Sequence, residues 1–398
     1  MTTSEASAAP ATSRPPAHAR VHPLLFAVLL VQLLAPFVIL QQPGLARGEF
    51  SKASDAARFH EIATTPGTPY RDFAVEYPPV AVGVFRALGG HDVGSFVRRL
   101  VVLNMLCQAT IVLLLFRVWG RRACVSYLCL SAPMLFIVYP TYDLVAVALG
   151  VAGAALIRRR HRTAGAVMLV IGGFAKLWPG GLLVLLARAR DKRAVVTGIA
   201  TAIAAAATWT VWGGPGAIGQ VLTFRGSRGW EFESVGASLL RIFSRHPLRF
   251  EAGAWRVGAP SPVVTVLGGL VVLVVVAIAW RRMAAGVPPR PGVGETVIVA
   301  ALVVASTLLS PQFTVWLLPW VAIAAAAGIT SLERWAGVVV GLTVLTWLSF
   351  EGSHPELGRT ELALLGRNAA LIGLLVAGLL ALRAPKVETA LTADVGAV

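Results

Sequence analysis

The chain has 398 residues, of which 56% are hydrophobic and only 14% charged, with a formal net charge of +16 and a mean hydropathy of +0.74. Apolar runs of membrane-spanning length recur along it, and a water-soluble fold of this size could not bury them all, so we exclude a soluble protein. The basic residues cluster in short connections between these runs, where they orient membrane spans, so the charge indicates no nucleic-acid partner. We predict an all-α polytopic membrane protein.

The chain begins with a Pro-, Ala- and Ser-rich segment, residues 1–21, which we predict to be a disordered cytoplasmic tail. The first apolar run, 24–40, lacks a small-residue cleavage site, so we interpret it as a membrane anchor. Residues 41–97 then form a long loop of mixed charge. Within this loop we expect an interfacial helix near 50–63 and a shorter apolar helix after Pro79.

The remaining apolar runs each predict a helix, at 98–117, 123–139, 142–157, 164–175, 177–188, 194–212, 262–280, 295–309, 311–328, 334–350 and 362–383. Several are too short to cross ~30 Å of hydrocarbon at about 1.5 Å per residue. We therefore expect broken or re-entrant helices around Pro140, Pro179 and Pro311. The prediction is a bundle of about 10–12 transmembrane helices over residues 22–384, followed by a cytoplasmic tail at 385–398.

Arginine-rich connections set the orientation of these helices. By the positive-inside rule the cytoplasmic connections are 117–122, 158–162, 188–193 and 280–291. The opposite, external side then receives 41–97, 139–143, the region of Lys176, 213–261, 310–312 and 351–361. All the long and chemically varied segments are therefore predicted to lie outside, and both termini inside.

Four polar stretches on the external side resemble, in order, the signatures of one family: YRDFAVEYPP at 70–79, the stretch from YPTYD to FAKLWP at 139–179, RGSRGWEFES at 225–234 and SPQFTVWLLPW at 310–320. They look like glycosyltransferase family 87, which includes actinobacterial polyprenol-phosphate-mannose-dependent α-mannosyltransferases. The resemblance covers residues from about 70 to 320. It implies the GT-C architecture, in which external loops form the active site and the first of them carries an essential acid.

Asp72 matches the position of that acid, with Glu76 as a second candidate. Transfer from a lipid-linked sugar phosphate requires a base that takes the proton from the attacking hydroxyl, and a carboxylate can also steady an oxocarbenium-like carbon. We predict Asp72 as this base. From spacing alone, a solvated loop carboxylate paired with Arg71 is the alternative. His354, in the last external loop, is a further candidate for assisting proton transfer.

A departing polyprenyl phosphate concentrates negative charge on its oxygens, which Lys or Arg stabilises. The candidates are Lys176, Arg225 and Arg228. Lys176 stands in an otherwise apolar stretch and must either face a polar cavity or reach an interface.

Further candidates for substrate contacts are Tyr77, Tyr142, Asp143, Trp230, Glu231, Glu233 and Gln312. Some of them have a plainer explanation. Asp143 lies at a predicted helix start, where the helix dipole favours an acid. Trp230 is of a type enriched at membrane interfaces, and Gln312 can bond to backbone freed by Pro311.

The resemblance implies a hexosyltransferase of a bacterial plasma membrane, with its active site facing the periplasmic or extracellular side. It would move a sugar, most simply mannose, from a polyprenyl-phosphate donor to an envelope glycolipid or glycan among the membrane lipids. We expect no cofactor, because no metal-binding Cys or His spacing occurs, and leave a divalent ion open. The alternative is a multi-pass transporter or flippase, which uses internal repeats that we do not find.

Overall fold

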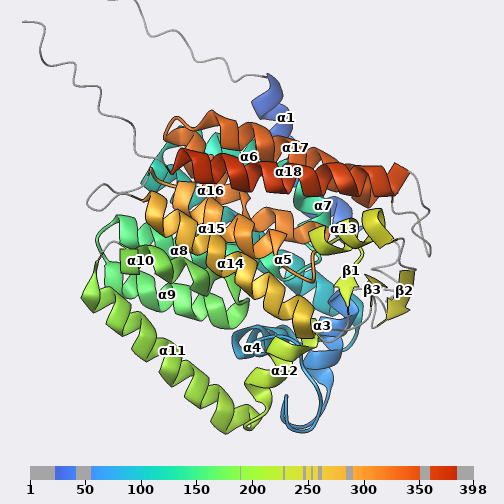
Figure 1. The fold of residues 1–398 in the computed structure, drawn as a ribbon. Coiled ribbons are helices and arrows are strands. Elements are labelled where there is room, and N and C mark those ends of the chain that lie inside the picture. The colour runs from blue at the N-terminus through green and yellow to red at the C-terminus, as the bar shows by residue number, and fades with distance from the viewer. Residues whose placement is uncertain are drawn as a thin grey trace, which may run out of the picture.

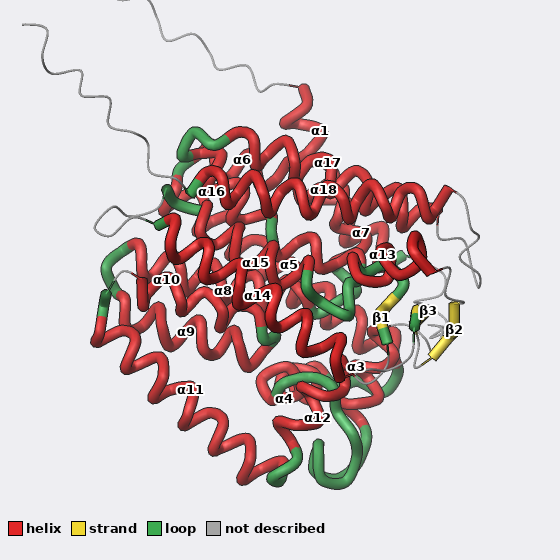
Figure 2. The backbone as a smooth tube through the Cα atoms, in the orientation of Figure 1, coloured by secondary structure: helices red, strands yellow, loops and turns green. Residues whose placement is uncertain are grey.

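The protein is built almost wholly of helices (Figures 1 and 2). The computed structural model describes residues 23–41, 55–188, 190–226, 229–244, 248–251, 254–258, 262–283, 290–349 and 359–382. The predicted tails at 1–21 and 385–398 lie outside this part. The prediction of an all-α polytopic fold is confirmed.

The predicted helix pattern of the first half is also confirmed. Its elements are α1 (Pro23–Leu40), α3 (Asp55–Thr64), α4 (Pro79–Leu88), α5 (Val93–Trp119), α6 (Arg121–Ser131), η1 (Ala132–Met134), α7 (Leu135–Val138), α8 (Asp143–Arg158), α9 (Arg162–Ala175), η2 (Trp178–Leu182), α10 (Leu183–Arg188) and α11 (Lys192–Gly213). Asp92 starts α5 with a capping box, because its carboxylate accepts a hydrogen bond from the Ser95 amide at 2.8 Å. Gly120, at φ 89°, adopts the left-handed backbone that ends α5 before α6 begins.

The second half adds α12 (Ala217–Gly226), β1 (Trp230–Glu231), α13 (Val235–Ser244), β2 (Leu248–Glu251), β3 (Ala254–Val257), α14 (Pro262–Arg282), α15 (Val293–Val304), η3 (Pro311–Trp316), α16 (Leu318–Ala326), α17 (Thr330–Ser349) and α18 (Arg359–Ala381). The three strands form a small antiparallel sheet in the order β1, β3, β2, in which Trp230 pairs with Val257. This sheet, within the long segment 213–261 that was predicted to be external, was not predicted from the sequence.

The expected breaks at three prolines are confirmed. Pro140 lies between α7 and α8, Pro179 lies in the 3-10 helix η2 that follows α9, and Pro311 begins the 3-10 helix η3 after α15 has ended at Val304. Proline lacks an amide hydrogen and clashes with the preceding turn, which disfavours a continuous helix there. The predicted run 295–309 is therefore helical only as far as Val304.

Small residues allow α8 and α9 to pack closely. A side chain on Gly165 would approach the Gly153 carbonyl oxygen to 2.7 Å, and one on Gly153 would meet Leu169 at 2.8 Å. Close approach through small residues is the usual means of helix packing in a bilayer, where lipid removes the hydrophobic drive for association. The pair α8 and α9 thus forms a fixed unit whose far ends carry Asp143 and Lys176.

Several helices turn apolar side chains outward. In the described part, four helices are long and apolar enough to cross a membrane, at Val93–Trp119, Arg121–Val138, Lys192–Gly213 and Thr360–Ala381, and shorter apolar helices accompany them. On α11, the exposed fractions are 64% for Val196, 64% for Ile203 and 77% for Val211. A bilayer is the solvent in which such a surface is stable.

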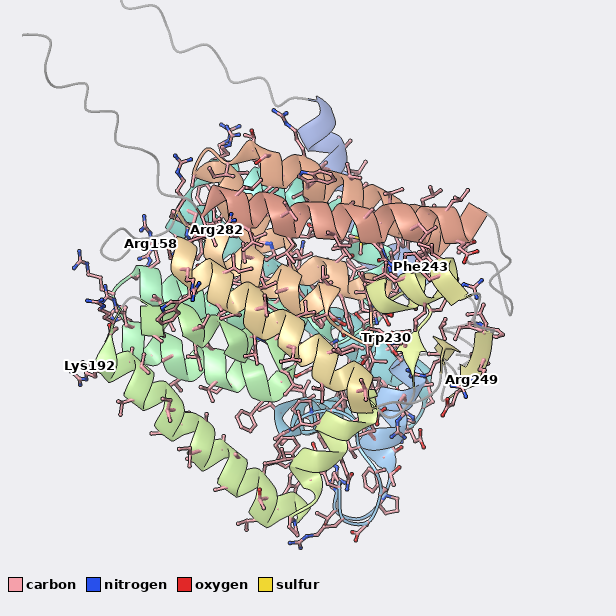
Figure 3. All side chains as sticks on the ribbon, in the orientation of Figure 1. Arg158, Lys192, Trp230, Phe243, Arg249 and Arg282 are labelled. Carbon is pink, nitrogen blue, oxygen red and sulfur yellow. The ribbon has the colours of Figure 1, made fainter. Side chains whose placement is uncertain are left out.

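The two predicted sets of connections lie at opposite ends of the bundle. Figure 3 shows Arg158, Lys192 and Arg282 at one end and Trp230, Phe243 and Arg249 at the other. Contacts tie the first set together: Arg159 donates to the Arg117 carbonyl at 3.2 Å, and Arg162 pairs with Asp191 at 2.9 Å. We call these the arginine end and the loop end.

The loop end should face outward. In a variant whose three native cysteines are replaced by alanine, Ala74→Cys should react with a membrane-impermeant maleimide in intact cells, and Arg160→Cys only after permeabilisation. Both positions are exposed, so access decides the outcome. Labelling of Arg160→Cys alone in intact cells would reverse the predicted orientation.

Candidate active site

A buried ion pair lies at the loop end, where α8 begins and α9 ends. The Lys176 ammonium is 2.6 Å from Asp143 Oδ1, and the two residues are 5% and 1% exposed. The same Oδ1 accepts a hydrogen bond from the Trp316 indole at 2.6 Å. Asp143 thereby joins α8, α9 and η3 through one carboxylate.

Aromatic rings cover the other side of Lys176. Its ammonium lies 4.6 Å from the centre of the Phe313 ring and 5.1 Å from that of Trp316, and these two rings stack at 4.2 Å. Cation–π attraction and the ion pair together hold a charge that burial alone would disfavour. The predicted polar environment for Lys176 thus has a definite geometry, and simple snorkelling to an interface does not describe it.

Asp55, the first residue of α3, lies near this pair. Its Oδ2 accepts a hydrogen bond from the Gln312 side chain at 2.9 Å. Asp55 is an exposed residue, as Asp72 is, although protein atoms surround its carboxyl group. This enclosure raises the pKa of Asp55 to about 6; Lys176 acts against the shift, and Asp143, Glu231 and Glu76 add to it. These charges interact with Asp55 because all lie at the loop end.

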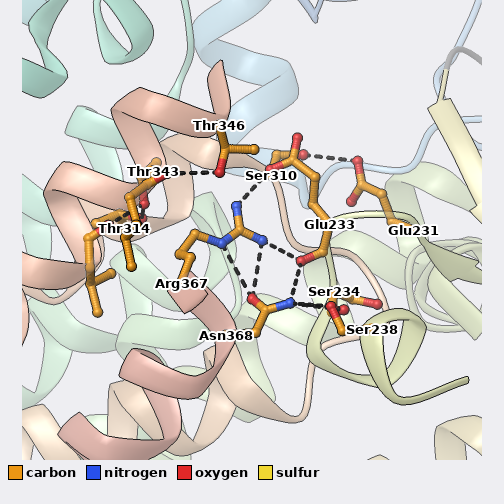
Figure 4. A network of polar contacts seen from close by, with 12 residues as sticks. Glu231, Glu233, Ser234, Ser238, Ser310, Thr314, Thr343, Thr346, Arg367 and Asn368 are labelled. Carbon is orange, nitrogen blue, oxygen red and sulfur yellow. Dashed lines mark hydrogen bonds and ion pairs between the residues drawn. The ribbon is translucent and has the colours of Figure 1, made fainter. Parts of the chain in front are cut away.

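Glu231 of β1 also lies next to η3, because it contacts Ser310, the residue that precedes this helix. It accepts a hydrogen bond from Ser310 at 3.0 Å, which Figure 4 shows, and its backbone amide donates to the Thr307 carbonyl. Burial raises the pKa of Glu231 to about 7, with the negative charge of Glu233 adding to the shift and Arg256 opposing it. Near neutral pH this carboxyl can therefore donate or accept a proton.

Glu233 has a different environment, because α18 binds it. Arg367, 1% exposed, pairs with the Glu233 carboxylate at 2.6 Å and also donates to its carbonyl oxygen, while Asn368 bonds to Ser238 at 2.7 Å (Figure 4). Burial raises the pKa of Glu233, and Arg367 counters the rise. This network fixes the segment after β1 and so places Glu231.

Asp72 and Glu76 lie in the loop between α3 and α4. Asp72 is exposed, and its carboxylate accepts a hydrogen bond from the Thr68 amide at 2.6 Å, which closes a turn. Arg71, the partner considered from the sequence, instead donates to the Val211 carbonyl. Both carboxylate oxygens of Glu76 bind Arg58, at 2.9 and 2.7 Å.

The aromatic candidates contribute mainly to packing. Tyr77 contacts Phe59 and Phe85 edge to face, and fully buried Tyr142 packs on Phe85 at 5.0 Å. Trp230, half-buried, lies so close to α13 that a side chain on Gly236 would overlap its ring. Arg228 and His354 lie outside the described residues, as does the side chain of Arg225.

Asp55 is the residue that sequence reasoning did not select. It occurs at the start of an expected interfacial helix, where an acid is common because it favours the helix dipole. Its position in the first predicted external loop was the available signal. The structure brings Asp55, Asp143, Lys176, Glu231 and Gln312 together and leaves Asp72 on an exposed turn.

An apolar groove of about 400 Å³ lies along the last turns of α9, the helix that Lys176 follows. It lies between α4, α9 and α11, and its walls include Pro79, Phe174, Ala205, Trp209 and Trp212. Phe174 is two residues before Lys176, so the groove reaches the level of the buried pair. Within the described residues, no group of three His, Cys, Asp or Glu side chains is arranged to hold a metal ion.

The buried pair should be essential to stability. Lys176→Met leaves the Asp143 charge buried without its partner, which should destabilise the protein by about 3 to 5 kcal/mol, and a thermal unfolding scan in detergent should show this. Lys176→Met with Asp143→Asn removes both charges and keeps an oxygen for Trp316, so it should recover much of the loss. A double variant no more stable than Lys176→Met would contradict this account.

Comparison with known proteins gives the functional class of the protein. Glycosyltransferase family 87 is the family whose sequence model matches, over residues 75–311, which is more than half of the chain. No curated protein matches the chain. The match supports a transferase, and nothing favours the alternative of a transporter or flippase. The chain belongs to glycosyltransferase family 87, as a multi-pass membrane glycosyltransferase that takes a sugar from a donor to an acceptor.

Proposed function

We propose that the protein transfers a sugar, most simply mannose, from a polyprenyl-phosphate donor to a glycolipid or glycan of the cell envelope, on the outer face of the plasma membrane. Asp55 is the proposed general base. The observation that carries this proposal is the position of Asp55: its carboxylate, with a pKa raised to about 6, lies against Gln312 beside the Asp143–Lys176 pair.

The reaction needs one proton acceptor. The Asp55 carboxylate takes the proton of the acceptor hydroxyl as that oxygen attacks the anomeric carbon, and the bond from this carbon to the phosphate oxygen breaks with its electrons on the phosphate. The sugar is thereby inverted at the anomeric carbon. A base works best when its pKa lies near the operating pH. Asp55, whose pKa is about 6, is largely ionised at neutral pH and is more basic than an ordinary aspartate.

Asp72 stays a predicted alternative base with weaker support. Its carboxylate closes a local turn with the Thr68 amide, whereas that of Asp55 contacts Gln312 near the buried pair. Glu76, the second candidate, binds Arg58 through both oxygens, which favours a structural role.

For the donor phosphate we propose Lys176, together with Arg225 and Arg228. Support for Lys176 comes from its fixed ammonium group, held by Asp143 and the Phe313 ring beside the proposed base. We propose that Gln312 and Glu231 bind sugar hydroxyls, since both present polar groups next to Asp55 or Ser310.

A lipid-borne donor explains the apolar groove. A soluble sugar nucleotide has no apolar portion to fill about 400 Å³ lined by Trp209, Trp212 and Phe174, whereas a polyprenyl chain does. The groove is bounded by α9, whose last turn leads to Lys176. A chain in the groove would bring its phosphate to the buried pair.

Asp55→Asn should lower the turnover number by about 100-fold or more with donor affinity nearly unchanged, because the amide keeps the shape and cannot take a proton. The assay is transfer from synthetic polyprenyl-phosphate mannose to envelope acceptors by purified protein. In the unaltered protein kcat/KM should fall as the pH drops below about 6, since protonation removes the base.

Asp72→Asn is the matched comparison, because it makes the same change in the same loop region. We expect it to stay within a few-fold of the unaltered enzyme. A large loss there with an active Asp55→Asn protein would return the base to Asp72. Failure of every lipid-linked sugar as a donor would refute the proposed function itself.

The groove gives a second test of the donor. Ala205→Trp fills it and should raise the apparent KM for a long-chain polyprenyl-phosphate sugar by about tenfold or more, while a donor with a short chain is affected less. Ala207→Trp, on an exposed face of the same helix, is the control and should leave the apparent KM of both the long-chain and the short-chain donor unchanged. Equal effects on long and short donors would argue against a chain-binding groove.

A further inference from the structure

A second pocket lies at the arginine end, opposite the candidate active site. Its volume is about 330 Å³, and Arg160, Arg162, Thr163, Asp191 and Arg193 line it. The first three come from the turn between α8 and α9 and the first residues of α9, and the other two from the start of α11. The proposed glycosyl transfer uses none of these residues.

The pocket has an excess of positive charge. Asp191 is its single acid, and both carboxylate oxygens are engaged: Oδ2 pairs with Arg162 at 2.9 Å, and Oδ1 accepts from the Ala194 amide at 3.1 Å. Among the described residues, no ion pair is formed by Arg160 or Arg193. Three guanidinium groups against one committed carboxylate leave a net charge of two, which favours an anion.

The backbone around the pocket is consistent with an anionic ligand. Arg160 has φ 68°, a left-handed conformation that glycine or asparagine adopts at lower cost, yet an arginine occupies it and lines the pocket. His161 gives no side-chain cap to the first amides of α9, at whose start Arg162 and Thr163 line the pocket. Uncapped amides at a helix start attract an anion in addition to the arginines.

The adjoining surface identifies the kind of anion. α11 leads from the pocket with Val196, Ile199 and Ile203 turned outward, at exposed fractions of 64, 54 and 64%. A ligand with its phosphate among the arginines can lay acyl chains along these side chains, and a free anion cannot. Basic pockets at the cytoplasmic surface of membrane helices bind the headgroups of acidic lipids.

We propose that the pocket of Arg160, Arg162 and Arg193 binds the phosphate headgroup of an anionic glycerophospholipid whose acyl chains lie along α11. The lipid would come from the leaflet at the arginine end. Because α9 and α11 also form walls of the apolar groove, a lipid that joins their beginnings would hold the spacing of the two helices. The inference does not depend on which sugar or donor the enzyme uses.

Native mass spectrometry of the purified full chain tests this, with dioleoylphosphatidylglycerol and dioleoylphosphatidylcholine as probes in mixed micelles. The unaltered protein should retain one phosphatidylglycerol in preference to phosphatidylcholine. Arg160→Gln with Arg193→Gln should weaken that retention at least tenfold. Arg162 is left in place because its ion pair with Asp191 joins α9 to α11.

Arg121→Gln with Arg122→Gln is the matched control, since it removes two exposed arginines at the same end, outside the pocket. Its lipid retention should be unchanged. Equal weakening in both double variants would show general surface attraction and overturn the proposal. Displacement of the lipid by millimolar inorganic phosphate, or no preference for phosphatidylglycerol in the unaltered protein, would also overturn it, even if the pocket variant failed to fold.

Discussion

The ion pair of Asp143 and Lys176 is the constraint on which the loop end depends. Burying two charges is costly, and the cost is offset only if the pair is closely made and further bonded, as it is here by Trp316 and the Phe313 ring. The pair fixes the first turn of α8 against the end of α9 and against η3. Because η3 carries Gln312, this geometry also determines where Asp55 is bound. The proposed base is thus placed by a network whose centre is an acid on another helix.

Acids outnumber bases around the proposed reaction centre, and this is where the pKa values are unusual. Asp55 and Glu231 both have raised pKa values because protein encloses them and because nearby carboxylates add to the shift, Asp143 and Glu231 at Asp55 and Glu233 at Glu231. A protein optimised only for stability would avoid such repulsion. The arrangement gives groups that exchange protons near neutral pH, which suits acid–base chemistry on sugar hydroxyls. Arg367 pairs with the neighbouring Glu233 and opposes the rise that burial causes in its pKa.

The two ends of the bundle use charge in different ways. At the arginine end, guanidinium groups line a pocket that, as we propose, holds a lipid headgroup. At the loop end, charged side chains are buried and bonded to specific partners, as Lys176 is to Asp143 and Arg367 to Glu233. The helices α9 and α11 run between these ends, and we propose that the groove they help to form binds the chain of a lipid-linked donor.

The sequence by itself determined the helices, their breaks at Pro140, Pro179 and Pro311, and the separation of basic from varied connections, because apolar run length, proline chemistry and local charge act over short stretches of chain. It also singled out Lys176, Asp143, Glu231 and Gln312 as chemically unusual. Only the tertiary structure decided how they meet: Gln312 reaches Asp55 across 257 positions and Ser310 reaches Glu231 across 79. Such contacts depend on how whole helices pack. For the same reason Asp72 looked suited to catalysis from its motif, although it lies on an exposed turn, and Asp55 looked like an ordinary first residue of a helix.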